Sequence, residues 1–137
     1  MPAPVRLPPS RMARILLVED EEDLRDVIRK ILELDDHDVI TAGNGWEGIK
    51  MLEDLGADVI LTDAYMPDVS GIELVVRLRH LDESVPVIVM SGGGWEDKTD
   101  VLDRARAAGA AATLEKPFDV RTLRNLVGRL LNQASDD

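Results

Sequence analysis

The run Val59-Ile60-Leu61-Thr62-Asp63 is apolar and β-prone, and it ends in a carboxylate. The same pattern, an apolar run closed by polar residues, recurs at residues 15–20, 87–91 and 111–116. If these runs are parallel strands, their polar ends gather at one edge of one sheet, where open α/β sheets bind ligands. The pattern therefore predicts a binding site built from strand ends.

Amphipathic stretches separate the apolar runs and predict helices. Asn44 can accept from first-turn amides and Glu47 can reach back toward the chain before the helix, as in a capping box. A short second strand is expected at residues 39–40, and the last helix is expected to end near Gln133. The apolar residues at helical spacing are Leu24, Val27, Ile28, Ile31 and Leu32; Ile49 and Leu52; Ile72, Val75 and Leu78; Val101, Leu102, Ala105 and Ala108; Leu123, Val127, Leu130 and Leu131.

Five strands alternating with five helices predict an α/β fold, a doubly wound parallel sheet between two layers of helices. The first, third and fourth strands are uniformly apolar, as expected of strands covered on both faces. The second strand contains Asp38 and Thr41 and few apolar residues, which favours an edge position. We expect a single domain over residues 13–134.

Composition excludes several kinds of function. The 137 residues suffice for one domain with a core, and the absence of cysteine excludes disulfides and thiol chemistry. His37 and His80 do not form a metal-ligand cluster, which disfavours zinc. A net charge of −11 disfavours nucleic acid and membrane as partners. The sequence contains no apolar export signal and no run of about 20 apolar residues, so we expect a cytoplasmic protein.

Residues 1–12 hold Pro2, Pro4, Pro8 and Pro9, which resist helix formation. This segment is expected to be a flexible, extended N-terminal arm. Its arginines leave two interpretations open, a disordered tail or a docking arm for an acidic partner.

Glu19, Asp20, Asp63, Ser91 and Lys116 all fall at the predicted strand ends. Each has an ordinary interpretation alone, as a helix cap, a turn residue or a surface lysine. Together, three carboxylates at one edge repel one another unless a cation lies between them, and Mg²⁺ is the hard divalent ion that prefers oxygen ligands. The ammonium and hydroxyl groups add positive charge and a donor, which suits a phosphoryl group.

Four segments in this order resemble the receiver domain of two-component response regulators, over roughly residues 13–134. They are ILLVEDE at 15–21, DAYMPDVSG at 63–71, VMSG at 89–92 and EKPF at 115–118. The resemblance implies a flavodoxin-like sheet with strand order 2-1-3-4-5. It also implies a phosphoacceptor signalling domain of a phosphorelay rather than an enzyme.

The resemblance further implies a role for each site residue. Asp63 would accept a phosphoryl group from a histidine kinase or a histidine phosphotransfer protein. Mg²⁺ would be held by Asp20, by Asp63, by the Tyr65 carbonyl and, through water, by Glu19. Ser91 and Lys116 would bind phosphoryl oxygens. The peptide bond between Lys116 and Pro117 is typically cis in this family.

The chain departs from the family pattern at Thr113, where many receivers carry an aromatic residue that turns inward on activation. Three glycines at 92–94 are followed by Trp95, for which we weigh a switching role against simple packing on the fourth helix. Tyr65 and Gly93 occupy positions that tune dephosphorylation in the family.

Four functions remain to be compared. The leading one is a stand-alone switch, a monomer or weak dimer, that binds an unknown downstream protein or relays phosphate. The second is a fragment of a larger regulator or hybrid kinase. A haloacid-dehalogenase-like phosphohydrolase is disfavoured because Tyr65 stands where an acid is needed. A P-loop is disfavoured because the glycines lack the lysine and hydroxyl that should follow them.

Overall fold

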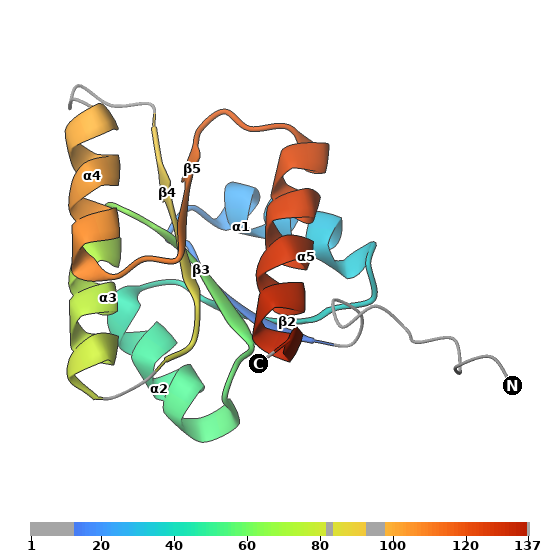
Figure 1. The fold of residues 1–137 in the computed structure, drawn as a ribbon, viewed down its shortest axis with the longest axis horizontal. Helices are drawn as coiled ribbons and strands as arrows, with labels where there is room; N and C mark the ends of the chain where they lie inside the picture. The colour runs from blue at the N-terminus through green and yellow to red at the C-terminus, as the bar shows by residue number, and fades with distance from the viewer. Residues whose placement is uncertain (1–12, 82–83, 93–97, 137) are drawn as a thin grey trace, which may run out of the picture.

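The computed structural model describes residues 13–81, 84–92 and 98–136, in which strands and helices alternate along the chain (Figure 1). The elements are β1 (Arg14–Val18), α1 (Glu22–Glu33), β2 (Asp38–Ala42), α2 (Gly45–Leu55), β3 (Val59–Asp63), α3 (Gly71–His80), β4 (Val87–Ser91), α4 (Lys98–Ala108), β5 (Ala112–Glu115) and α5 (Val120–Asp136).

All strand pairs are parallel, and the strand order is β2-β1-β3-β4-β5, as predicted. The second strand lies at an edge, which confirms the interpretation of its polar residues. Asp63 is in register with Met90, and Ser91 with Glu115. The carboxyl ends of β3, β4 and β5 therefore meet at one edge of the sheet.

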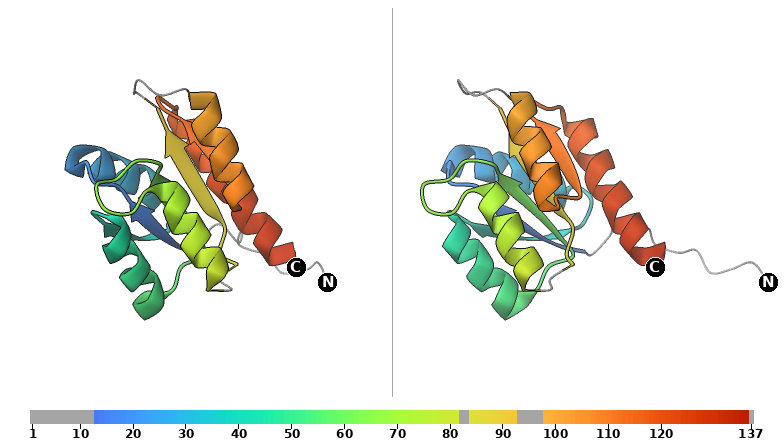
Figure 2. Two further views of the ribbon diagram at one scale, coloured as in Figure 1. Left: turned by 90° about the vertical axis from the view of Figure 1, so that its left-hand side faces the viewer. Right: turned by 60° about the vertical axis from the view of Figure 1, so that its left-hand side comes forward.

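Helices cover both faces of the sheet (Figure 2). Side chains alternate across a strand, so Ile15 and Leu17 of β1 pack with α1 and α5, whereas Leu16 and Val18 pack with α2, α3 and α4. The apolar residues of β1, β3 and β4 are buried, as predicted for strands covered on both faces. Two separate apolar clusters thus hold the sheet in place and fix where its polar ends lie.

Several helix predictions need correction. Val27 is 53% exposed although it belongs to the apolar residues that repeat at helical spacing in α1. The last helix runs to Asp136, past Gln133. Asn44 caps α2 as expected, by accepting from the Glu47 amide at 2.9 Å. Glu47, however, accepts from the amide of Gly43 and not from that of the capping residue.

Glu19 and Asp20 do not cap α1, and Ser91 does not cap α4, so these ordinary interpretations of the polar strand ends are wrong. Glu21 is the residue before α1 and makes no capping bond through its side chain, so neither Glu19 nor Asp20 is the N-cap. Helix α4 begins at Lys98, seven residues beyond Ser91. These side chains are therefore left for another role.

The N-terminal arm at residues 1–12, Gly93, Gly94 and Trp95 lie outside the described residues. The predictions for them remain predictions. Within the part of the chain that the structure describes, no helix has the length and apolar character needed to cross a bilayer.

Candidate functional site at the carboxyl edge of the sheet

Two strand ends deliver the three carboxylates of the site. Glu19 directly follows β1 and is only 1% exposed, while Asp20 beside it is exposed. Asp63 is the last residue of β3, and its side chain is 15% exposed. Backbone bonds continue past both strand ends, from the Glu19 amide to Ala42 at 3.0 Å and from Ala64 to Met90 at 2.7 Å. The carboxylates are thus carried by backbone that the sheet holds in place.

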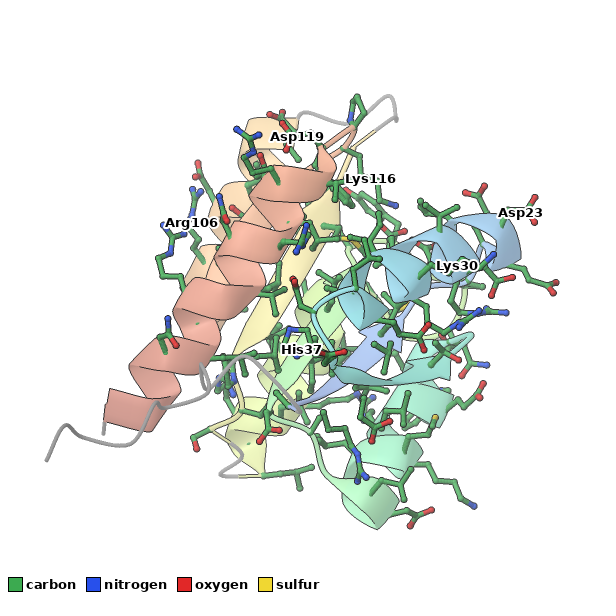
Figure 3. The ribbon with its side chains drawn as sticks, turned by 90° about the vertical axis from the view of Figure 1, so that its right-hand side faces the viewer. Asp23, Lys30, His37, Arg106, Lys116 and Asp119 are labelled. Carbon is green, nitrogen blue, oxygen red and sulfur yellow. The ribbon has the colours of Figure 1, made fainter. Side chains whose placement is uncertain are left out.

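Lys116 joins two of these carboxylates. Its Nζ lies 3.2 Å from Oδ1 of Asp63 and 3.2 Å from Oε1 of Glu19. Its backbone amide donates to the carbonyl of Ser91 at 2.7 Å, and its peptide bond to Pro117 is cis, as expected. Figure 3 shows Lys116 in the upper part of the view and His37, which precedes β2, well below it.

The electrostatics show that negative charge is costly here. Burial raises the pKa of Asp63, although Lys116 opposes the shift. Burial likewise raises the pKa of Glu19, against the Glu21 amide and Lys116. Burial alone lowers the pKa of Lys116, but the two carboxylates outweigh it and raise that pKa overall. A single ammonium group therefore leaves part of the negative charge uncompensated.

The carboxylates of Glu19, Asp20 and Asp63 can each offer one oxygen, and these oxygens lie within 4.8 Å of one another. Oxygen donors at this spacing, with a net excess of negative charge, fit a hard divalent cation. The donor set therefore suits a metal of the magnesium type and disfavours zinc, which prefers nitrogen and sulfur.

Ser91 and Tyr65 lie at the same edge. Ser91 ends β4, is buried, and is tied to Lys116 through its backbone carbonyl. Tyr65 follows Asp63 by two residues, and its side chain is exposed. The structure thus places all six predicted site residues at the carboxyl ends of β1, β3, β4 and β5, with direct ion pairs among Glu19, Asp63 and Lys116.

Gly71 is required because a larger residue has no room at this position. A Cβ at this position would lie 2.2 Å from the carbonyl oxygen of Asp63, far inside any allowed contact. The Gly71 amide also donates to Ala64 at 2.9 Å. The start of α3 therefore packs directly on the backbone at the end of β3.

The contacts that two residues near the site, Asp68 and Arg25, make were not predicted from the sequence. Asp68 accepts bonds from the amides of Gly45 and Trp46, and Arg25 donates to the carbonyl of Glu19 at 2.9 Å. The partners of Asp68 lie 22 and 23 residues away, so no local spacing signals the contact. Its position in the loop directly after Asp63 was the one available hint.

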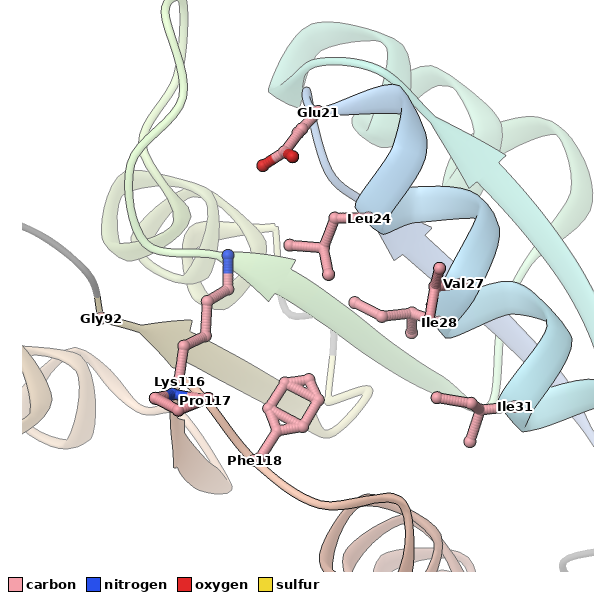
Figure 4. Close-up of a pocket in the computed structure, with 9 residues that line it drawn as sticks. All are labelled: Glu21, Leu24, Val27, Ile28, Ile31, Gly92, Lys116, Pro117 and Phe118. Carbon is pink, nitrogen blue, oxygen red and sulfur yellow. The ribbon is translucent and has the colours of Figure 1, made fainter.

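An apolar groove of about 500 Å³ lies beside Lys116, between α1 and the segment after β5 (Figure 4). Its position explains why Val27 is exposed, because that side chain lines the groove. The other apolar lining residues include Leu24, Ile28, Ile31 and Phe118. The groove thus borders the charged site with a surface suited to apolar side chains.

Thr113, at the position where many receivers have an aromatic residue, accepts a hydrogen bond from Arg106 of α4 at 2.9 Å. A hydrogen bond between β5 and α4 is therefore found where many receivers have an aromatic ring.

Comparison with known families gives a match over residues 15–128 to the model described as the response regulator receiver domain. The chain belongs to the response regulator receiver family. Receiver domains are the signalling domains of two-component systems and receive phosphate from histidine kinases or phosphotransfer proteins. The predicted resemblance is therefore confirmed at the level of the family.

Individual relatives agree with this membership. Sporulation initiation phosphotransferase F of Bacillus subtilis is 27% identical over 118 residues, which cover 86% of this chain and 93% of that protein. A receiver domain protein of Clostridium thermocellum, known as a crystal structure, superposes with a TM-score of 0.82 at 28% identity, covering 90% of this chain and 97% of the other.

Other relatives are longer. The transcriptional regulatory protein TrcR of Mycobacterium tuberculosis is 34% identical over 119 residues, which are 85% of this receiver chain but 43% of the relative. The chain thus spans less than half of several curated regulators that it matches.

Proposed function

We propose that Asp63 is the phosphoacceptor of this receiver domain and that its phosphorylation depends on Mg²⁺. One observation carries the proposal, namely that Asp63 lies between the ammonium group of Lys116 and the acidic cluster with Glu19 and Asp20. A carboxylate flanked by positive charge on one side and by cation ligands on the other has the surroundings that phosphoryl transfer requires.

The residues present fit a bound Mg²⁺. Asp20, Asp63 and the carbonyl of Tyr65 would hold it directly, with Glu19 contributing through water. When bound, the ion supplies positive charge that offsets the repulsion among the carboxylates and the charge on the phosphoryl oxygens.

In the proposed reaction, a carboxylate oxygen of Asp63 attacks the phosphorus of a phosphohistidine. The bond between phosphorus and the imidazole nitrogen breaks, and its electron pair stays on that nitrogen. Lys116 pairs with one phosphoryl oxygen while it remains beside Asp63, and the hydroxyl of Ser91 donates to another. The chain itself contributes alignment and charge stabilisation, so it acts as a signalling domain and not as a turnover enzyme.

The phosphodonor would be a sensor histidine kinase or a histidine phosphotransfer protein. Such a partner would approach Asp63 from the carboxyl edge of the sheet, where the apolar groove lined by Lys116 lies nearby. The phosphorylated domain would then change its binding to a downstream protein or pass the phosphoryl group on. The likeness to a relative named as a phosphotransferase supports the second possibility.

Phosphorylation by acetyl phosphate with Mg²⁺ tests the proposal without knowledge of the partner. We expect an acid-stable but hydroxylamine-sensitive phosphoryl adduct that does not form when EDTA is added. If the intact protein forms no adduct with acetyl phosphate or with a cognate kinase, and binds no beryllofluoride, the proposed function is wrong.

A further inference from the structure

Asp68 lies in the loop between β3 and α3 and reaches across to the start of α2. Its Oδ1 accepts from the amide of Gly45 at 3.1 Å and its Oδ2 from the amide of Trp46 at 2.9 Å. First-turn amides have no partner within their own helix, and the helix dipole favours negative charge there. The capping residue Asn44 takes a different amide, that of Glu47. Asp68 is therefore a link between two segments that are distant in sequence.

A second, independent contact joins the same segments. A Cβ on Gly45 would lie 2.6 Å from Cβ of Val69 and 2.9 Å from its carbonyl oxygen. Val69, the neighbour of Asp68, is buried. The first turn of α2 thus packs directly on the loop, and the two hydrogen bonds hold it in that register.

This loop is also part of the phosphorylation site. It runs from Asp63 to Gly71, and both ends are held by backbone bonds, from Ala64 to Met90 and from Gly71 to Ala64. The carbonyl of Tyr65, an expected metal ligand, lies between these ends, three residues before Asp68. A shift of the middle of the loop would move that carbonyl relative to Asp63.

We propose that Asp68 is a positioning residue, which holds the loop against α2 and thereby places the Tyr65 carbonyl for metal binding beside Asp63. This inference rests on the proposed function. A carboxylate suits the task because its two oxygens bind two amides at once, whereas an amide side chain offers one acceptor oxygen. Slight burial raises the pKa of Asp68, but the bonds from Trp46, Val69 and Gly45 outweigh it and lower that pKa, which keeps the group charged.

Three variants separate this role from helix capping. Asp68→Ala removes both bonds, and Asp68→Asn can keep one. Asn44→Ala removes a cap from the same helix end but leaves the link to the loop intact. If Asp68 were only a cap of α2, the Ala variants at 68 and 44 would behave alike.

The first measurement uses metal-free protein. Amide hydrogen exchange followed by NMR should become faster at Gly45 and Trp46 in Asp68→Ala, and at Glu47 in Asn44→Ala. The second measurement is Mg²⁺ affinity by calorimetry, with and without beryllofluoride. We expect Asp68→Ala to bind Mg²⁺ roughly tenfold more weakly, as when a group that orients a metal ligand is lost. Asp68→Asn should fall in between, and Asn44→Ala should stay within about twofold of the wild type.

Equal Mg²⁺ affinity in wild type and Asp68→Ala would overturn the inference and leave the proposed function standing. Equal losses in Asp68→Ala and Asn44→Ala would also overturn it, by reducing Asp68 to a cap. If the wild type binds neither Mg²⁺ nor beryllofluoride, the proposed function fails and the inference fails with it.

Discussion

The two edges of the sheet both carry charged residues but use them differently. At the amino edge, Arg14 donates to Asp38 at 2.9 Å, to Asp58 at 2.8 Å through its backbone, and to the carbonyl of Leu55 at 2.7 Å. At the carboxyl edge, Lys116 is shared between Asp63 and Glu19, while Asp20 adds a third carboxylate.

The carboxylates of the two edges differ in their exposure to water and in the number of hydrogen-bond donors around them. The carboxylates of Asp38 and Asp58 are exposed, so water compensates for them and their bonds serve to fasten strands. Glu19 and Asp63 are largely removed from water, and one lysine cannot offset the charge of the cluster. Charge at the amino edge is therefore structural, whereas the excess at the carboxyl edge is suited to binding a cation and a phosphoryl group.

The largest expected effect is on phosphorylation, when an aspartate is replaced by asparagine at the carboxyl edge and, for comparison, at the amino edge. Asp63→Asn should reduce labelling by acetyl phosphate by more than about a hundredfold, because the nucleophilic carboxylate is lost. Asp58→Asn should label like the wild type, since an amide oxygen can still accept from Arg14. Mass spectrometry of the intact protein measures both. Comparable labelling of Asp63→Asn and wild type would contradict the assignment of the acceptor.

Replacing the basic side chain at each edge by methionine compares how much Lys116 and Arg14 contribute to the stability of the folded protein. Without metal, Lys116→Met should lower the free energy of unfolding by roughly 2 kcal/mol, because it leaves two poorly hydrated carboxylates unpaired. Arg14→Met should cost about 1 kcal/mol or less, since its ion pair is exposed. Urea unfolding at neutral pH measures both values. A greater loss in Arg14→Met would reverse the comparison of the edges.

Magnesium should stabilise the protein through the carboxyl edge. At ten times its dissociation constant, the ion should raise the free energy of unfolding by about 1.4 kcal/mol, and EDTA should reverse the effect. Asp20→Asn should weaken this response, and Asp38→Asn at the opposite edge should keep it. Thermal unfolding with increasing Mg²⁺ measures the response. An equal loss in both variants would argue against a specific site.

The smallest expected effect is a pH dependence arising at the amino edge, where His37 is buried before β2. Burial lowers the pKa of His37 below the ordinary 6.5, although Asp35 and Asp36 oppose the shift. The folded state therefore prefers neutral histidine, so this contribution to stability is present above pH 6.5 and decreases as the pH falls toward the folded pKa.

Replacement of His37 by Gln should flatten the dependence of unfolding free energy on pH between about pH 7.5 and about pH 5.5. His80→Gln provides the matched control, because His80 is exposed on α3. A slope that persists in His37→Gln would assign the dependence to other groups.

Much of the architecture was predictable because it depends on local patterns. The apolar run ending at Asp63 and the polar second strand were enough to predict a parallel sheet with covered central strands. The acidic cluster was predictable because parallel strands bring their carboxyl ends together. The resemblance to receivers supplied the strand order and the role expected of Lys116.

What was missed depends on contacts between distant segments. Periodicity grouped Val27 with the other apolar residues of α1, but it cannot show that a groove opens beside that side chain. Asp68 binds amides more than 20 residues away, which no spacing rule reports. The need for glycine at position 71 arises from the carbonyl of Asp63 in another element, which the sequence around position 71 does not reveal.

That close packing at Gly71 has a consequence for genetic screens. In a saturation library selected for signalling, position 71 should reject substitutions about as strictly as position 63, although glycine has no group that reacts. Even alanine would force its methyl group against the carbonyl oxygen of Asp63 at the end of β3. Intolerance to substitution would thus report two different requirements eight residues apart, one for the proposed nucleophile at position 63 and one for empty space at position 71.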